Sequence, residues 1–521
     1  MDIVNCAVVN PPSPNDLRRW VAMLKQAEAN NHLQGIVDVL KNIPLTSPAA
    51  MALLISLLAE KGVASAWQLA KLLHGQGVGN EVSAFAEGLG ESLFGQPDAF
   101  QHTVQRLGHL ADGLPAPRLS ALYEVIKVPL RDIGLDAFRK QNHDLILRRL
   151  LPLMQAAVPA FRTLLDLQAP VPTVDLSRMA EEGAQRAKLL NFPCSDGQNR
   201  RPRRALVAVR KIVLGKREFE FGPFFTRCLR VYGWHATFFG IEMTTANAIY
   251  QQLSHQCQEM QPEVIFLDLE LMLLDGNGRA LFFELMIQLR RIVPGVKIVA
   301  LYFDVHYLDK AVFDVASAMS DLSWTLGGTD NLYREMDSFS NRVYCPLVSE
   351  DSFRGQLLPL KESIHFSGRV FNVNWHRLFW LAAVENFKLP ITVEITPPQL
   401  PQQTDILQDY KNYNQRIAES CGCLNFSMRD NLHCSFTGRP FEVILNRSLL
   451  VQERNPVMDY YFVAGEHYLE FSSFAQLRGI LHLLQEQPAE VEKVRQRGFA
   501  FAQGRYSNEK IIGHLEQRLF G

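Results

Sequence analysis

Between residues 205 and 328, short runs of consecutive apolar residues alternate with longer segments of helical period, and this alternation strongly limits the possible folds. We expect strands at Ala205–Val209, His235–Ile241, Val264–Leu269, Val296–Phe303 and Leu322–Gly328. We expect helices between them at Pro223–Tyr232, Thr245–Met260, Arg279–Ile292 and Asp309–Met319. Continuous apolar strands separated by helices predict a parallel, doubly wound sheet of the α/β class.

Ligands of such sheets bind beyond the carboxyl ends of the strands. The segments expected at that edge are Lys211–Gly222, Asp268–Glu270 and Asp304–His306. The same topology occurs in response-regulator receivers, in which an aspartate placed like Asp268 accepts a phosphoryl group. A receiver also needs an acidic pair after its first strand to bind magnesium, and Val209-Arg210-Lys211 stands there instead. We therefore exclude a receiver function.

A second series of strands and helices begins at Ser363, and it predicts a second parallel sheet. Its expected elements are a strand from Ser363 that ends in Ser367-Gly368-Arg369, helix Trp375–Asn386, strand Ile391–Ile395, strand Cys421–Ser427, helix Arg439–Leu445, strand Ser448–Glu453, and helices Phe474–Gln485, Val491–Gly498 and Asn508–Phe520.

Two polar groupings in this second series suit a nucleotide diphosphate. Arg439 and Glu442 stand at i, i+3 on the first helical turn, where the guanidinium favours an anion and the carboxylate can accept hydrogen bonds from sugar hydroxyls. Gly368-Arg369 leaves a backbone without a Cβ beside a second guanidinium, which suits a pyrophosphate. The alternatives are a capped helix with an internal Arg–Glu pair and a simple strand-end turn.

The order of these segments, continued by Asp459–Tyr468 and a late Tyr506-Ser507, resembles the CgeB-like glycosyltransferases of the spore maturation protein family, glycosyl transferases group 1. The resemblance covers about residues 360–515 and is weaker over 203–350. It implies a GT-B architecture, two Rossmann-type domains facing across a cleft, with a nucleotide-sugar held mainly by the second domain. It also implies that Glu442 holds the ribose.

The resemblance assigns further residues by position. Arg439 would lie near the diphosphate, Glu453 would close the far end of its strand, and the ring of Tyr410 would stack on the base. Two departures are evident. Leu445-Asn446-Arg447 replaces the Ala-Cys-Gly that is common in the family, and Cys434 stands where the related pattern has an acid.

These features predict a glycosyltransferase that moves a sugar from a nucleotide-diphosphate sugar to a protein or glycan acceptor without a metal or another cofactor. Arg369 and Arg439 would stabilise the leaving diphosphate. His306, Asp304 or Asp268 would supply a general base from the opposite rim. The alternative is a non-catalytic scaffold with a degenerate transferase half, which the altered Leu445-Asn446-Arg447 segment favours.

Before the first sheet the chain has a different character. Residues 14 to about 165 show helical period, with helix lengths even enough to suggest stacked pairs but without a clean repeat. Residues 168–204 lose the pattern and contain the basic cluster Arg200–Arg204, so they predict a linker. The expected domains are therefore an all-helical domain for bracing or acceptor capture (1–167), a linker (168–204) and two Rossmann-like domains (205–355 and 356–521).

Composition limits the remaining function classes. A chain of 521 residues is too long for a single core, and its net charge of −1 gives no general attraction to nucleic acid or anionic membranes. Met1–Asn15 lacks the basic start and apolar core of a secretory signal, and no window of 18 uncharged apolar residues occurs, so we expect neither a signal nor a membrane span. The 8 cysteines are scattered, their spacing matches no known zinc module, and they fit reduced thiols in a cytoplasmic protein.

Overall fold

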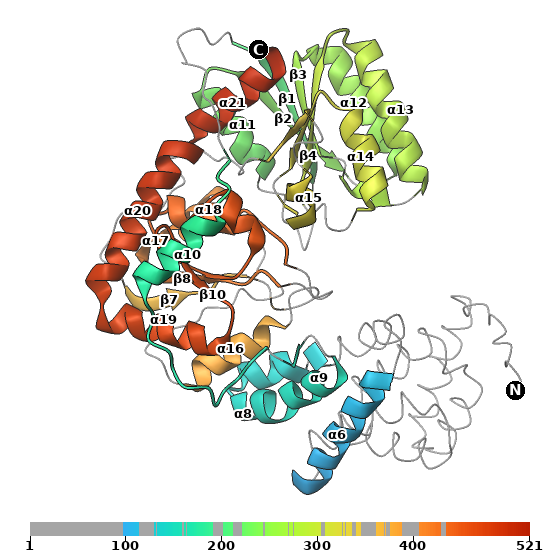
Figure 1. Cartoon of the computed structure of the whole chain (residues 1–521). Coiled ribbons are helices and arrows are strands. Elements are labelled where there is room, and N and C mark those ends of the chain that lie inside the picture. Colours follow the sequence, from blue (N-terminus) through green and yellow to red (C-terminus); the bar gives the residue numbers. More distant parts are fainter. Residues whose placement is uncertain are drawn as a thin grey trace, which may run out of the picture. The chain divides into compact units, whose positions relative to one another are not determined.

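In the computed structural model the chain folds into two compact units. Figure 1 shows the whole chain, coloured along the sequence. The first comprises Met1–Pro170, Val370–Leu389 and Ser473–Ala475, and the second comprises Val171–Arg369, Pro390–Ser472 and Gln476–Gly521. The structure describes residues 97–113, 130–131, 133–158, 161–162, 164–190, 202–211, 221–242, 245–268, 270–274, 276–303, 308–325, 327–328, 330–335, 340–344, 361–368, 370, 376–387, 406–428 and 434–521.

The first predicted sheet is confirmed. Within the described residues it has six strands, all parallel, in the order β2-β1-β3-β4-β5-β6. The strands are β1 (Arg204–Lys211), β2 (His235–Glu242), β3 (Val264–Leu267), β4 (Lys297–Tyr302), β5 (Leu322–Thr325) and β6 (Arg342–Val343). The order reverses between β1 and β3, and in a doubly wound sheet ligands gather beside such a reversal.

Helices cover both faces of this sheet, as Figure 1 shows. One face packs against α12 (Ala246–Met260), α13 (Gly276–Ile292) and α14 (Lys310–Ala318), and the other against α11 (Phe221–Val231) and the last helix, α21 (Asn508–Phe520). The indole of Trp234 donates a hydrogen bond to Glu516 Oε1 in α21 at 2.9 Å. The short helices η4 (Glu270–Leu274) and α15 (Asp330–Arg334) follow β3 and β5.

The second sheet is also parallel, with described strands in the order β10-β9-β8-β7. These are β7 (Lys361–His365), β8 (Ser420–Asn425), β9 (Leu450–Glu453) and β10 (Leu469–Phe471). Its helices are α17 (Ile406–Glu419), α18 (Arg439–Leu445), η9 (Pro456–Tyr460), α19 (Phe474–Glu486) and α20 (Pro488–Tyr506). Two parallel sheets flanked by helices confirm the predicted α/β class and its pair of Rossmann-like halves. The expected strand Ile391–Ile395 lies outside the described residues.

The segment expected to be a linker contains a helix, α10 (Leu176–Arg186), which the sequence pattern did not predict. Asp175 caps it by accepting the amide of Arg178 at 3.0 Å. Its one buried residue, Gly183, lies against the backbone of Ala464. Leu176, Met179, Ala180 and Gly183 do share one face at helical spacing, but two of the four are small residues and the rest of the helix is polar. The apolar stripe is therefore weak, and the sequence pattern did not reveal the helix.

Helix α20 is longer than predicted. The expected end at Gly498 was wrong, because the helix continues to Tyr506. Gly498 lies where the helix passes the backbone carbonyl of His467, and a Cβ there would clash with that oxygen. The glycine therefore permits close packing inside a helix and does not end it.

In the first unit the described elements are all helical. They are α6 (Pro97–Gly113), α8 (His143–Leu145), a π-helical turn η1 (Ile146–Leu150), α9 (Leu151–Ala157) and α16 (Arg377–Asn386). Eight consecutive residues of α16, Arg377–Val384, are buried, and the ring of Phe379 meets Phe161 edge-on at 5.9 Å. The helices expected before residue 97 and at Leu119–Ile126 lie outside the described ranges. In the parts described, no helix is both long and apolar enough to cross a membrane.

Gly465 provides a test of how tightly α10 is packed. Its φ is +76°, and a Cβ would clash with the backbone of Ala180 in α10. We expect Gly465→Ala to lower the free energy of unfolding by about 3 kcal/mol, from left-handed strain plus overpacking. Gly233→Ala is the matched control, because Gly233 has a φ of +85° and open space around it. It should cost about 1 kcal/mol. Urea denaturation followed by fluorescence measures both, and equal losses would contradict the tight packing.

Candidate functional site

The first turn of α18 brings together the two residues that the sequence singled out. Arg439 Nε lies 3.6 Å from Glu442 Oε2. A third residue, Tyr413 of α17, completes the cluster, since its hydroxyl donates to the same Oε2 at 2.8 Å. The guanidinium of Arg439 donates to the Tyr413 hydroxyl and lies 5.1 Å from the centre of its ring. Tyr413 was not among the predicted site residues.

The sequence of α18 explains why these side chains face outward. Pro440 stands in the first turn, where a missing backbone N–H costs nothing. Phe441, Val443 and Ile444 are buried, and Phe441 meets the ring of Tyr461 edge-on at 5.1 Å. The opposite side of this short helix leaves Glu442 34% exposed. A helix of seven residues has a weak dipole, so attraction of an anion depends on the guanidinium.

The altered segment after α18 has a structural explanation. Arg447 has a φ of +61°, a left-handed conformation that glycine adopts most easily. Buried Asn446 donates to Asn414 Oδ1 and to the Glu442 carbonyl, both at 2.8 Å. The backbone therefore turns as a glycine would allow it to, and the departure lies at the far end of the helix from Arg439.

His365 is a second residue that the sequence reasoning passed over. It ends β7, pairs in register with Cys423 of β8, and is 5% exposed. Burial, assisted by the charges of Arg439 and Arg416, lowers its pKa to about 4. The imidazole is therefore neutral near pH 7. The available signal was its place at a strand's carboxyl end, three residues before Gly368.

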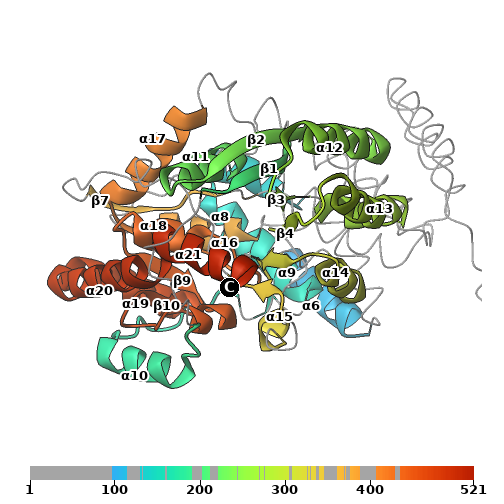
Figure 2. The same cartoon turned by 90° about the horizontal axis from the view of Figure 1, so that it is seen from above.

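The other predicted donor-site residues have varied surroundings. Gly368 is half-buried after β7, and Arg369 lies outside the described residues. The ring of Tyr410 stacks on Phe224 of α11 at 4.4 Å, and Figure 2 shows α17 beside α11. One face of that ring is thus already covered by the first sheet's helix. Base stacking by Tyr410 remains a prediction.

Glu453 ends β9 as expected, and its contacts are internal. Its Oε2 accepts the backbone amides of Ser427 at 2.7 Å and Met428 at 3.0 Å. The residue is 6% exposed. Glu453 therefore ties the loop after β8 to the end of β9.

The structure describes one of the three candidate bases, Asp268. Asp268 follows β3 and is 0% exposed, with Oδ2 3.1 Å from Arg210 Nε. Glu270 lies 3.9 Å from the same guanidinium and accepts the amide of Phe303 at 3.1 Å. Asp304 and His306 lie outside the described residues. The basic residue that excluded a receiver, Arg210, is thus the ion-pair partner of Asp268.

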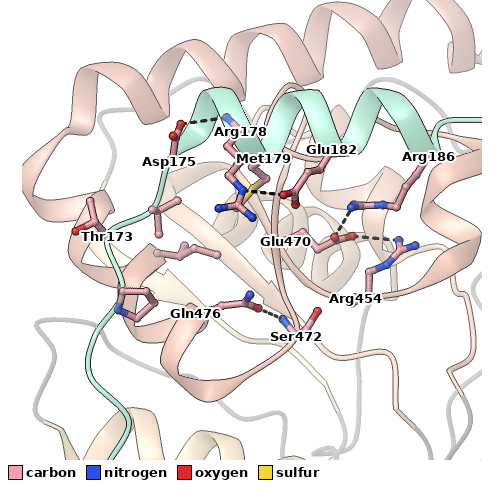
Figure 3. Close-up of a pocket in the computed structure, with 13 residues that line it drawn as sticks. Thr173, Asp175, Arg178, Met179, Glu182, Arg186, Arg454, Glu470, Ser472 and Gln476 are labelled. Atoms are coloured by element: carbon pink, nitrogen blue, oxygen red, sulfur yellow. Dashed lines mark hydrogen bonds and ion pairs between the residues drawn. The ribbon is translucent and has the colours of Figure 1, made fainter.

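A cavity of about 440 Å³ lies between α10, the edge strand β10 and the start of α19 (Figure 3). Its lining residues are Pro172, Thr173, Val174, Asp175, Arg178, Met179, Glu182, Arg186, Arg454, Glu470, Ser472, Gln476 and Ile480. Glu470 lies between two guanidinium groups and accepts from Arg186 at 2.6 Å and from Arg454 at 3.2 Å, as Figure 3 shows. Arg178 pairs with Glu182 at 2.8 Å. The Arg186–Glu470 pair joins α10 to β10, whereas the Arg178–Glu182 pair lies within α10.

The described part of the chain contains no cluster of side chains suited to bind a metal ion. No group of three or more His, Cys, Asp or Glu side chains there is placed to hold an ion.

Residues 377–517 match a protein-family model described as glycosyl transferase-like. This confirms the predicted enzyme class for the segment that contains α18. No curated protein matches the chain by sequence.

Solved structures resemble the chain only distantly. Sucrose-phosphate synthase from Thermosynechococcus elongatus is 11% identical, with a TM-score of 0.43 over 61% of this chain and 99% of that chain. The Anabaena protein HepE in complex with UDP and glucose is 7% identical, with a TM-score of 0.42 over 61% and 99%. A UDP-GlcNAc 2-epimerase from Neisseria meningitidis is 10% identical, with a TM-score of 0.37 over 60% and 99%. Likenesses at these scores carry no argument about activity.

The neutral state of His365 predicts a pH dependence of stability. An unfolded histidine titrates near pH 6.5, whereas His365 titrates near 4, so between these values the unfolded chain binds the extra proton. Stability should be complete above pH 6.5 and fall by up to about 3 kcal/mol as the pH drops to 4. His365→Gln should remove the contribution of His365 to the pH dependence of the free energy of unfolding. Denaturation measured between pH 6.5 and pH 4 would test this.

Buried His467 offers an independent comparison, because its pKa is also lowered to about 4 by burial and by Arg497 and Arg505. His467→Gln should reduce the pH dependence of stability by a similar amount, and the double variant should lose the contributions of both histidines. If the stability of His365→Gln depended on pH as strongly as that of the wild type, the pKa of His365 would be the same in the folded and unfolded states. That result would contradict a lowered pKa.

Proposed function

We propose that this protein is a metal-independent glycosyltransferase that takes a sugar from a nucleotide-diphosphate sugar bound at the second sheet. The observation that supports this proposal is that the candidate cluster lies inside the segment that matches a known family. The glycosyl transferase-like segment, 377–517, contains the Arg439–Glu442–Tyr413 cluster, which pairs a cation with a half-exposed carboxylate.

Each side chain of the cluster has a role suited to its chemistry. The Glu442 carboxylate accepts hydrogen bonds from ribose hydroxyls and so positions the donor. Arg439, with Arg369 and the bare backbone at Gly368, neutralises the diphosphate as it leaves. Burial would lower the pKa of Arg439, but Tyr413 and Glu442 outweigh it and raise the pKa, so the guanidinium keeps its charge.

The general base belongs to the carboxyl edge of the first sheet. Asp268 is a poor candidate base, because substrate cannot reach a fully buried carboxylate that is already paired with Arg210. Asp304 and His306, which follow β4 in the chain, are the better candidates of the three predicted.

The acceptor would be a protein or glycan, with the N-terminal helical region as the surface that captures it. A cytoplasmic location fits the free thiols in the described residues, Cys228, Cys257, Cys421, Cys423 and Cys434. The alternative is a scaffold whose transferase half has lost activity.

Glu442→Gln tests the donor assignment with little change in shape. We expect donor affinity to fall by about 10- to 100-fold, the cost of losing a hydrogen bond to a charged group. The measurement is binding and hydrolysis of a panel of isotope-labelled nucleotide-sugars. Glu490→Gln, in the first turn of α20, is the control and should leave affinity unchanged.

Two outcomes would contradict the proposal in different ways. Unchanged donor affinity in Glu442→Gln would remove Glu442 from the donor site. A wild-type protein that neither binds nor hydrolyses any donor in the panel would favour the scaffold.

A further inference from the structure

We propose that Tyr413 is a positioning residue that locks one oxygen of Glu442 and thereby keeps the other for a ribose hydroxyl of the donor. This inference rests on the proposed function, because it assigns Glu442 to a nucleoside diphosphate. Tyr413 belongs to α17 and precedes Glu442 by 29 residues, so the contact joins two separate helices.

The two carboxylate oxygens of Glu442 have different surroundings. The Tyr413 hydroxyl and Arg439 both approach Oε2, at 2.8 Å and 3.6 Å. Within the described residues Oε1 has no hydrogen-bond partner, and the side chain is 34% exposed. One oxygen is thus fixed by the protein and the other is presented to solvent.

The direction of the hydrogen bonds supports a donating role for Tyr413. Its hydroxyl oxygen accepts from the Arg439 guanidinium, so its own proton points to Glu442. Burial raises the pKa of Tyr413 well above the ordinary value, so the hydroxyl keeps that proton. A hydrogen bond from a cation into the hydroxyl also polarises it and strengthens the next bond in the chain.

The helix that carries Tyr413 is fixed on both sides of the residue. Buried Asn414 accepts a hydrogen bond from Asn446 at the end of α18, at 2.8 Å. Tyr410, one turn earlier, stacks on Phe224 of α11. The position of the hydroxyl is therefore set by the packing of α17 and does not depend on a bound ligand.

The consequence of losing the hydroxyl follows from arginine geometry. A guanidinium prefers to bind a carboxylate through two parallel hydrogen bonds, one to each oxygen. Without Tyr413 at Oε2, Glu442 is expected to turn so that both oxygens face Arg439. Oε1 would then no longer be available to the ribose, and Arg439 would be less available to the diphosphate.

Tyr413→Phe isolates the hydroxyl, because it keeps the ring beneath Arg439. We would titrate UDP, GDP, ADP and CDP into the full-length protein by calorimetry, then the 2′-deoxy and 3′-deoxy forms of the tightest binder. The ribonucleotide Kd should rise about five- to tenfold in the variant, as expected for one hydrogen bond. The ratio between deoxy and ribo Kd values should shrink towards one, and a merely structural role would not change that ratio.

Tyr468→Phe is the matched control. Its hydroxyl donates to Glu470 at 3.0 Å in the ion-pair network under α10, so the variant loses the same kind of bond elsewhere. It should lower stability without changing either Kd. A Tyr413→Phe protein that loses affinity equally for the ribo and deoxy forms, or loses none, would overturn the inference and leave the proposed function standing. If the wild type binds none of the four nucleotides, the proposed function fails and this inference fails with it.

Discussion

The ring of Tyr461 joins the two sheets, and the packing of the candidate site depends on it. This fully buried ring stacks on Phe436 at 5.0 Å and an interplanar angle of 4°. Its hydroxyl lies 3.0 Å from that of Tyr333 in α15 and donates to the carbonyl of Tyr344 after β6, at 2.9 Å. Its own carbonyl accepts from Tyr506 at the end of α20, at 2.7 Å. A buried tyrosine is stable only where its polar atoms are satisfied, and here both sheets satisfy them.

The same cluster fixes the orientation of α18. Phe441 meets Tyr461 and Tyr506 edge-on, at 5.1 Å and 5.3 Å. Because Phe441 is held from two directions, the adjacent Glu442 must face away from the aromatic core, towards α17. A helix of seven residues has little stability of its own, so this packing, and not helix propensity, presents the carboxylate.

The spacing of apolar residues along the sequence was enough to predict most helices and strands of the α/β region. Arg439–Leu445 was predicted with the bounds of α18, because a proline-led apolar run between two strands leaves few alternatives. Contacts between distant elements were not accessible in this way. The bond from Tyr413 to Glu442 needs the packing of two helices, and the Arg210–Asp268 pair needs the order of strands β1 and β3. The candidate site was therefore only partly predictable, since Arg439 and Glu442 share a helix whereas Tyr413 contacts them through tertiary structure.

The residue just after α18 shows how a side chain other than glycine can occupy a left-handed turn. Arg447 adopts a φ of +61° where glycine is the easiest choice, and its side chain lies over the ring of Phe499 at 4.8 Å. Strain of this kind costs on the order of 1 kcal/mol, and the arginine–aromatic contact offsets part of it. A residue other than glycine can thus hold a left-handed turn when a side-chain contact offsets the strain. The residue type at this position therefore does not by itself reveal the path of the backbone.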